Sequence, residues 1–278
     1  MRYNGITRWL CTIGLMMAAG AASGATIVVT SAADNVADDG ACTLREAIAA
    51  SVEDFPSGRM SGECAQGDVG LDTIHFDIKG TGPFVFSPRT PLPVVTQPIF
   101  IDGYSQPGAK ANSRTTGNDA VILIEIDGSS TAAACPTYLR GQRAEDVSPV
   151  QGMGLQFSEA GANGSRLRGI AIGGFSSSHA GAIMLYQVGG VQIDGNFIGL
   201  RPDGSQNTNG GSGIWILNGD YTEVISEKMF TVNKPGKTRG LSGVYTNAIG
   251  ARKASRRLQR SINSSREQVC HLRPNRKP

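Results

Sequence analysis

Acidic side chains and arginines are the residues of this sequence that could support catalysis. They are Asp102, Glu125, Asp127 and Asp194, together with Arg166 and Arg168. Hydrolysis of a glycosidic bond needs two carboxylates flanking that bond, one acting as an acid and the other as a base or nucleophile. A lyase would use carboxylates to hold a cation, a basic residue to take a proton, and arginines to hold an anionic substrate. The residue types therefore allow a polysaccharide lyase or a glycoside hydrolase.

Three of these acids occupy the same place in a repeated phrase, which favours a structural role for them. The phrase covers residues 99–103, 124–128 and 191–195, and its copies end in Asp102-Gly103, Asp127-Gly128 and Asp194-Gly195. In a near-copy, Gly173 replaces the aspartate. Aspartate in such a turn accepts a bond from the amide two residues later, and glycine supplies a positive φ. We therefore expect turns at these positions, no catalytic residues, and a chain that is not an enzyme.

The spacing of the phrase predicts a repeating fold. Its fourth residue falls at positions 102, 127, 173 and 194, so the intervals are 25, 46 and 21. These are about one, two and one times a unit of roughly 23 residues, which is typical of a solenoid. Each short strand should pair in parallel with the equivalent strand one rung earlier, so that inward Ile and Val side chains stack into a continuous core. The 37 glycines and the aromatic content of only 6% also fit stacked rungs better than a globular α/β core.

The N-terminus has the features of an export signal. Arg2 and Arg8 precede or flank an apolar stretch over residues 9–22, and small residues follow it, with cleavage expected after residue 25. The apolar run is shorter than the 20 or so residues of a comfortable membrane span, and no second run follows downstream. An uncleaved anchor is the alternative. We expect a secreted or cell-surface protein with no transmembrane segment after cleavage.

Four cysteines remain once Cys11 is lost with the signal. Cys42 and Cys64 are the predicted disulfide pair, closing a 22-residue interval around a predicted helix. Such a closure stabilises the fold by about 3 kcal/mol in the loop-entropy estimate. Cys135 and Cys270 are isolated, and whether they meet is open. No Cys/His spacing resembles a zinc site, so no metal or other cofactor is expected.

The predicted helix begins after Thr43, in the segment CTLREAIAA. Thr43 can cap its N-terminus while Glu46, three residues later, bonds back to the amide of the cap. A strand is expected before it at residues 26–30, and another at 72–78, where His75 falls on the polar side of the alternation and is expected at the surface. Three aspartates also cluster in a turn without EF-hand spacing, so no calcium site is expected there: Asp34, Asp38 and Asp39.

Charge separates the chain into two segments of opposite sign. Residues 26–218 hold 11 Lys/Arg against 19 Asp/Glu, a net charge of −8, whereas residues 219–278 hold 13 against 4, a net of +9. The repeated phrase also stops before residue 219. We therefore expect 219–278 to be a basic tail, disordered or foreign to the fold, with a tail that binds an anionic surface as the alternative. No nucleic-acid partner is expected, because residues 252–260 combine charge with no aromatic side chains.

Four motifs resemble those of a known family. DGACTLREAI at 39–48, followed by DTIHF at 72–76, resembles the CSLREA-type N-terminal region of exported bacterial β-helix proteins. IDGYSQPG at 101–108 and GNFIGLRPDG at 195–204 are similar to recurring segments of the same family. The resemblance implies a right-handed parallel β-helix capped by an N-terminal helix. Family members usually continue with further rungs after the GIWI segment, so this chain looks truncated or frame-altered after about residue 218.

These observations predict one all-β protein in four segments: a signal peptide over 1–25, the N-terminal cap region over 26–80, parallel β-helix rungs over 81–218, and the tail over 219–278. We expect a monomeric structural or adhesive module whose partner is extracellular polysaccharide or a host or cell surface. Trp215 is a candidate platform for a sugar ring, with ordinary packing in an apolar strand as the alternative. The other function considered is a β-helix polysaccharide lyase or glycoside hydrolase, which rests on analogy of fold.

Overall fold

Parallel β-strands make up most of the protein in the computed structural model. The structure describes residues 23–115, 117–131, 152–176, 181–217, 223–224, 230–231 and 244–247. Within them the strands form three sheets, and every strand pairing inside these sheets is parallel. One α-helix and three short 3-10 helices accompany the strands in the described residues. The expectation of an all-β parallel fold is confirmed.

The three sheets are defined here by their strands in spatial order. The first sheet consists of β1 (Thr26–Val29), β2 (Asp72–Phe76), β4 (Ile99–Asp102), β7 (Arg166–Arg168), β10 (Gln192–Asp194) and β13 (Glu223–Val224). The second sheet consists of β3 (Phe84–Phe86), β5 (Ile124–Asp127), β8 (Ile170–Gly173), β11 (Phe197–Ile198) and β14 (Phe230–Thr231). The third sheet consists of β6 (Met153–Ser158), β9 (Gly181–Tyr186), β12 (Ser212–Leu217) and β15 (Val244–Asn247).

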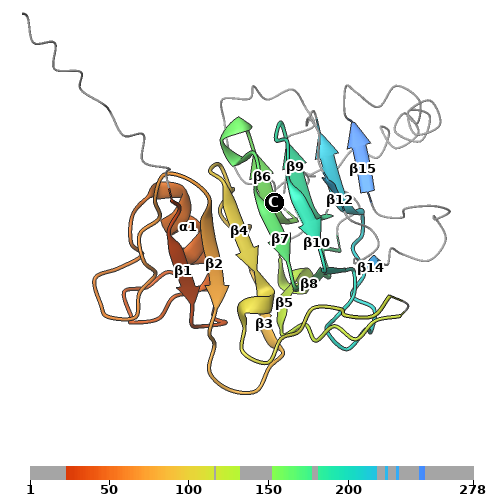
Figure 1. The fold of residues 1–278 in the computed structure, drawn as a ribbon, viewed down its shortest axis with the longest axis horizontal. Coiled ribbons are helices and arrows are strands. Elements are labelled where there is room, and N and C mark those ends of the chain that lie inside the picture. Colours follow the sequence, from red (N-terminus) through yellow and green to blue (C-terminus); the bar gives the residue numbers. More distant parts are fainter. Residues whose placement is uncertain are drawn as a thin grey trace, which may run out of the picture.

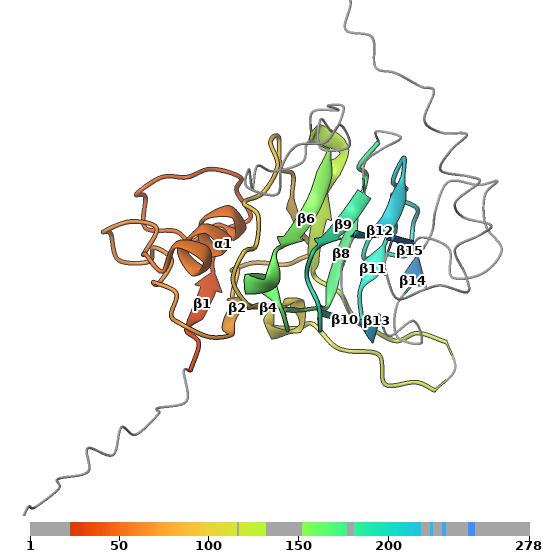
Figure 2. The same cartoon turned by 90° about the horizontal axis from the view of Figure 1, so that it is seen from above.

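The chain visits these sheets in a fixed order. From β4 to β15 it passes from the first sheet to the second and then the third, four times over. Each strand lies beside the strand that held its place one circuit earlier, so the strands follow one another along the long axis of the molecule (Figure 1). The view from above shows the strands of the different sheets around a common interior (Figure 2). The copies of the repeated phrase are not the corresponding strands of successive circuits that their spacing predicted. Residues 99–103 and 191–195 supply β4 and β10 of the first sheet, with β7 between them, whereas residues 124–128 and the near-copy at 170–174 supply β5 and β8 of the second sheet. The predicted unit was wrong because the intervals of 25 and 21 residues carry the chain from one sheet to another, and the interval of 46 residues between β5 and β8 is a single circuit.

Direct register stacks like residues on like residues in the interior. Ile74, Ile101, Leu167 and Ile193 are partners across four strands of the first sheet, and each is 0% exposed. The second sheet stacks Ile126, Ile172 and Ile198 in the same way. Full burial of such a side chain contributes about 1.5–3 kcal/mol relative to its exposed state. Outward residues of the same strands alternate with these and carry the polar groups, as period-two strands require.

Helix α1 (Leu44–Glu53) covers the first end of the core. Its capping box is present: the Glu46 amide donates to the Thr43 hydroxyl at 3.2 Å, and the Thr43 amide donates to the Glu46 carboxylate at 2.9 Å. Leu44 and Ile48 are buried in the main core beside β1 (Figure 1). The helix therefore closes an end that would otherwise expose apolar side chains and an open strand edge. The predicted cap is confirmed, and the helix extends three residues beyond the expected end at residue 50.

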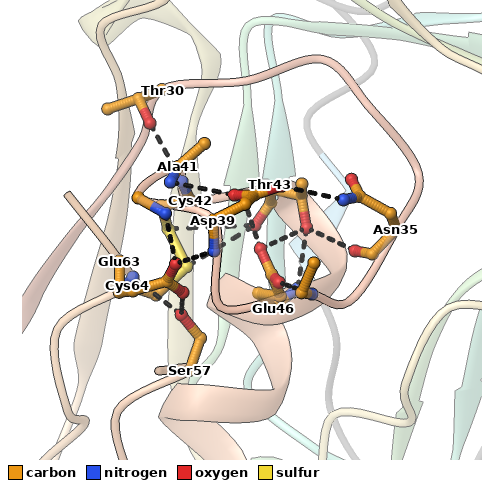
Figure 3. The surroundings of a disulfide bond; sticks show 12 residues. Thr30, Asn35, Asp39, Ala41, Cys42, Thr43, Glu46, Ser57, Glu63 and Cys64 are labelled. Carbon is orange, nitrogen blue, oxygen red and sulfur yellow. Dashed lines mark hydrogen bonds between the residues drawn. A yellow bond between two sulfur atoms is a disulfide. The ribbon is translucent and has the colours of Figure 1, made fainter. Parts of the chain in front are cut away.

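A disulfide ties the loop after α1 to the residue before the helix cap. Cys42 and Cys64 are bonded, as predicted, and both are buried (Figure 3). Next to this bond, the Glu63 carboxylate accepts from the amides of Asp39 and Gly40 and from the Ser57 hydroxyl. The two loops of the cap region are thus joined by a covalent bond and by a carboxylate that collects three donors.

Three short strands lie in the described part of the segment after residue 218. β13, β14 and β15 add one parallel strand to each sheet. The phrase stops before residue 219, so the sequence pattern did not predict them, and pairing continues into the segment expected to be foreign to the fold. The rest of residues 219–278, residues 1–22 of the signal peptide predicted over 1–25, and both Cys135 and Cys270 lie outside the described residues.

Candidate functional site

Two aspartates of the repeated phrase, Asp102 and Asp127, cap the turns that follow their strands. The amide of Tyr104 donates to the Asp102 carboxylate at 3.1 Å, and the amide of Ser129 donates to the Asp127 carboxylate at 3.0 Å. Each aspartate precedes a 3-10 helix, Gly103–Ser105 in one case and Gly128–Ser130 in the other. The predicted bond to the amide two residues later is therefore confirmed at both positions.

The glycines of the phrase differ from the expected role at two of three positions. Gly195 has a positive φ of 63°, as predicted. Gly103 and Gly128 do not; a Cβ at Gly103 would overlap the carbonyl of Gly169, and a Cβ at Gly128 would overlap the ring of Phe175. The expectation of a positive φ was wrong for these two, because close packing of the next circuit, rather than backbone conformation, excludes a side chain there.

Arg168, a candidate anion-binding residue, is bound to Asp102. Its Nε and Nη2 donate to the two carboxylate oxygens at 2.9 and 2.7 Å. Asp102 is buried, and the Arg168 guanidinium also lies 5.0 Å from the centre of the Phe100 ring. The hydrogen bond to Asp102 raises the pKa of Arg168 above its ordinary value. A paired, two-pronged contact of this kind fixes both side chains and leaves the acid poorly placed for catalysis.

Tyr104 links the turn after β4 to the turn after β10. Its hydroxyl donates to the carbonyl of Gly195 at 2.6 Å, 91 residues away in sequence. The ring passes over Gly169, where a Cβ would meet both the ring and the backbone of Tyr104. Burial, with a further contribution from the charge of Asp194, raises the pKa of Tyr104 to about 12. The phenol therefore remains a neutral donor throughout the physiological range.

The second sheet carries a buried pair of acids beneath an arginine. Glu125 and Asp127 point outward from β5, yet they are only 3% and 8% exposed. Arg201, which follows β11, donates to Glu125 at 2.5 Å and to Asp127 at 3.2 Å. Asn207 contributes weaker contacts of 3.5 Å to both acids. The loop after β11 is thus anchored two strands away from where it starts.

Small residues on the strand between them allow this contact. β8 lies between β5 and β11, and its outward positions in register with the two acids are Ala171 and Gly173. The near-copy of the phrase lacks acids at the positions over which the loop crosses. Neither Arg201 nor Asn207 was among the candidate site residues predicted from the sequence. The absence of acidic residues from the near-copy at 170–174 was the feature of the sequence that could have located the contact of Arg201 with the two acids.

Glu125 and Asp127 have pKa values shifted in opposite directions. Burial raises the pKa of Glu125 even though the Arg201 charge opposes it. Burial also acts to raise the pKa of Asp127, but hydrogen bonds from Ser129 and the charge and hydrogen bond of Arg201 outweigh it, so that pKa is lowered. Two neighbouring acids whose pKa values are shifted in opposite directions are typical of an acid and base pair. Here, however, the same guanidinium occupies both.

Asn196 is a further structural residue that the sequence analysis did not single out. It is fully buried in the short turn between β10 and β11. Its amide nitrogen donates to the carbonyls of Leu167 and Asp194 at 2.9 Å, and its oxygen accepts from the amide of Ile170 at 3.0 Å. One side chain therefore satisfies backbone groups of two successive circuits, as buried polar groups require.

The remaining candidates lie on outer faces of the sheets. Arg166 is exposed on β7, and Asp194 and His75 are half-buried on β10 and β2. Trp215 on β12 is half-buried and packs against the apolar cluster of Met153 and Met184. This placement is consistent with packing and leaves part of the indole accessible. The structure brings Asp102, Asp194 and Arg168 onto one sheet, and it places Glu125 and Asp127 on another.

Neither a metal centre nor a membrane helix is found in the part of the chain that the structure describes. Its His, Cys, Asp and Glu side chains form no group of three or more suited to holding a metal ion. The turn aspartates have protein partners instead: Asp34 pairs with Arg45 at 2.7 Å, and Asp38 accepts from the amides of Arg59 and Met60. No described helix has the length and apolar character needed to cross a bilayer.

No protein-family model, curated protein or solved structure matches this chain. The function must therefore be argued from the residues themselves. The described acids act mainly as turn caps and as partners of arginines, while the outer face of the first sheet presents polar, aromatic and charged side chains in register.

Proposed function

We propose that the chain is an exported, non-catalytic module built as a right-handed parallel β-helix, and that it contacts polysaccharide outside the cell. The observation that carries the proposal is the repeated visit to three parallel sheets with like residues in direct register. Neighbouring strands in a sheet lie about 4.8 Å apart, so an outer face repeats its side chains at that spacing. A rigid, repeating face of this kind suits an extended polymer.

The use of the acids supports a non-catalytic role. Asp102 and Asp127 cap turns and bind arginines, and Glu125 is buried beneath Arg201. A hydrolase would need two carboxylates with a glycosidic bond between them. The carboxylates of Asp102, Glu125 and Asp127 lie against the protein's own guanidinium groups instead.

Export is supported by the cysteines and by the N-terminal sequence. A buried disulfide persists most readily in an oxidising compartment, and Cys42 and Cys64 form one. The apolar stretch over residues 9–22 is typical of a signal peptide in length and composition. The resemblance of residues 39–48 to the CSLREA-type region agrees with both points.

Affinity electrophoresis of the chain after export and processing tests the proposal. Native gels containing glucuronoxylan, polygalacturonate or dextran would be compared with a gel lacking polysaccharide, with bovine serum albumin as the reference. We expect one or more polymers to retard the protein while releasing no reducing ends or unsaturated products. Unchanged mobility in every gel, or product release, would overturn the proposed function.

One observation favours a glycoside hydrolase or lyase as a second candidate. The pKa of Glu125 is raised by burial and that of Asp127 is lowered, as in an acid and base pair. If these acids were catalytic, Glu125→Gln and Asp127→Asn would each abolish product release from the same polymers. We expect no product from the unmodified chain, since Arg201 occupies both carboxylates.

A further inference from the structure

A continuous row of outward side chains crosses the first sheet from β1 to β10. It is called the outer row and consists of Thr26, Thr73, Phe100, Arg166 and Gln192, each in direct register with the next. All five are exposed or half-buried. With strands about 4.8 Å apart, the row is roughly 19 Å long, which is enough for several consecutive sugar units. The row runs along the direction in which the strands are stacked.

The chemistry of the outer row matches that of a sugar polymer. Thr73 and Gln192 supply a hydroxyl and an amide, which can donate to and accept from sugar hydroxyls. Between them, Phe100 offers an apolar ring that can pack against the C–H face of a sugar. Aromatic surface combined with a few polar groups that fix orientation is typical of carbohydrate and other small-molecule sites.

The ring of Phe100 is held in place before any ligand arrives. The Arg168 guanidinium lies 5.0 Å from the ring centre, and Arg168 is itself fixed by two bonds to the buried Asp102 carboxylate. A contact residue that is already ordered loses little conformational entropy on binding. Phe100 is therefore a stacking residue of the outer row whose ring is already ordered before a ligand binds.

The charges around the row restrict the kind of polymer. Arg166 is exposed and has no ion pair within the described residues, whereas the charge of Arg168 is balanced by Asp102. Asp194 lies on the next strand, two positions along from Gln192, and remains half-buried. One carboxylate can therefore pair with Arg166, but a second one beside it would approach Asp194 and be repelled.

We infer that the outer row binds a largely neutral polysaccharide with widely spaced carboxylates, through stacking on Phe100 and a charge-assisted hydrogen bond to Arg166. The inference rests on the proposed function and names its binding face and ligand class. A polymer with a carboxylate on every sugar fits less well because of Asp194. A fully neutral polymer retains the stacking contact and loses only the contact with Arg166.

Glucuronoxylan and its carboxyl-reduced form provide a matched pair of probes. Dissociation constants would be measured by affinity electrophoresis for the processed chain and for Phe100→Ala, Arg166→Gln and Val85→Ala. Val85 is an exposed residue on β3 of the second sheet and serves as the control. Thermal unfolding of each variant would verify that the fold is retained, as expected for side chains that are not buried.

Each variant has a distinct expected result. Phe100→Ala should weaken binding of both probes about tenfold, which corresponds to loss of a stacking contact worth about 1.4 kcal/mol. Arg166→Gln should weaken binding of glucuronoxylan about three- to fivefold and leave the carboxyl-reduced probe unaffected, as expected for an exposed ion pair. Val85→Ala should change neither. Polygalacturonate should bind the unmodified chain more weakly than glucuronoxylan does.

Three outcomes separate failure of this inference from failure of the proposed function. If the unmodified chain binds glucuronoxylan and both Phe100→Ala and Arg166→Gln bind it equally well, the outer row is not the site, while the proposed function stands. Loss of binding in Trp215→Ala alone would likewise overturn the inference by placing the site on the third sheet. If the unmodified chain binds no polysaccharide at all, the proposed function fails and the inference fails with it.

Discussion

Glu125 shows that an ion pair need not favour the charged form of a buried acid. Burial raises its pKa although Arg201 is 2.5 Å away. A folded pKa above the unfolded one means that Glu125 contributes most to stability below its ordinary pKa. That contribution is lost as the pH rises through the folded pKa. Asp127, with a lowered pKa, has the opposite dependence: its contribution is present above its ordinary pKa and is lost in acid.

Glu125→Gln should therefore change the pH dependence of unfolding. Near pH 7 the neutral amide avoids the cost of a buried charge, so we expect a melting temperature equal to or above that of the unmodified chain. At about pH 4, where Glu125 is increasingly protonated, the advantage should shrink or reverse. Scanning calorimetry between these two pH values measures the difference in melting temperature between the two proteins. Both proteins contain Asp127, so the comparison isolates the effect of Glu125. A difference in melting temperature that stays constant with pH would contradict the raised pKa of Glu125.

At the glycines of the repeated phrase, residue types were easier to predict than the reasons for them. The sequence identifies Asp-Gly turns correctly, and the aspartates act as expected. It cannot reveal that Gly103 is required by the carbonyl of Gly169, because that contact depends on how tightly the next circuit packs. A positive φ can be predicted from the residues of the turn itself, whereas a close approach between segments that are distant in sequence cannot.

Gly103→Ala tests this close approach. Its Cβ would overlap a backbone oxygen, so strands must shift, and we expect a loss of about 1–3 kcal/mol in the free energy of unfolding. Gly204→Ala is the matched control, because Gly204 has a positive φ of 83° but open space around it. Chemical denaturation of both variants separates the two causes. If Gly103→Ala loses less free energy of unfolding than Gly204→Ala does, backbone conformation, and not the close approach of the next circuit, is the larger constraint on these glycines.

At the scale of elements, two side chains tie together circuits that are separated by one other circuit, and they do so from opposite directions. Tyr104 reaches forward from the turn after β4 to the turn after β10, and Arg201 reaches back from the segment after β11 to β5. Both cross an intervening strand or turn at small residues, Gly169 in one case and Ala171 with Gly173 in the other. Strands as short as β11, with two residues, gain support from such contacts.

Tyr104→Phe should loosen the turn between β10 and β11. The variant keeps the ring and removes the hydroxyl that donates to Gly195 at 2.6 Å, leaving a partly buried carbonyl without that donor. We expect a loss of about 1–2 kcal/mol. Hydrogen exchange should show faster exchange at residues 195–198, while amides of β1 and β2 keep their protection. Tyr186→Phe is a control on the third sheet. Equal protection at residues 195–198 in both variants would argue against the contact.

For the whole molecule, the fold was more predictable than the candidate site. Parallel strands follow from the repeated phrase, and the cap and disulfide follow from short-range spacing, but the circuit through three sheets does not follow from the predicted repeat length. The contact between Arg201 and Glu125 spans 76 residues, and neither residue has a local pattern that identifies its partner. β13 to β15 were not predicted for a different reason: backbone pairing can continue where the repeated phrase has ended.

Stacked architecture makes the consequences of a core substitution spread along the molecule. Ile193 is 0% exposed, between Leu167 of β7 and the backbone of β13. Ile193→Asp places an uncompensated charge in that stack and should cost several kcal/mol. The matched Gln192→Asp changes the adjacent, half-buried position and should leave the melting temperature nearly unchanged. Calorimetry checks both; an unaltered, cooperative transition in Ile193→Asp would refute the expected burial.

The extent of the damage in Ile193→Asp reports how the molecule is held together. In a stack where each circuit contacts its neighbours, disruption at β10 should reach β7 and β13 first and fade towards β1. The disulfide and the capped helix close the far end, so amides near Cys42 should keep the most protection. Hydrogen exchange resolved by segment measures this gradient. Uniform loss from β1 to β12 would instead indicate a single cooperative unit, in which the cap and the circuits cannot unfold separately.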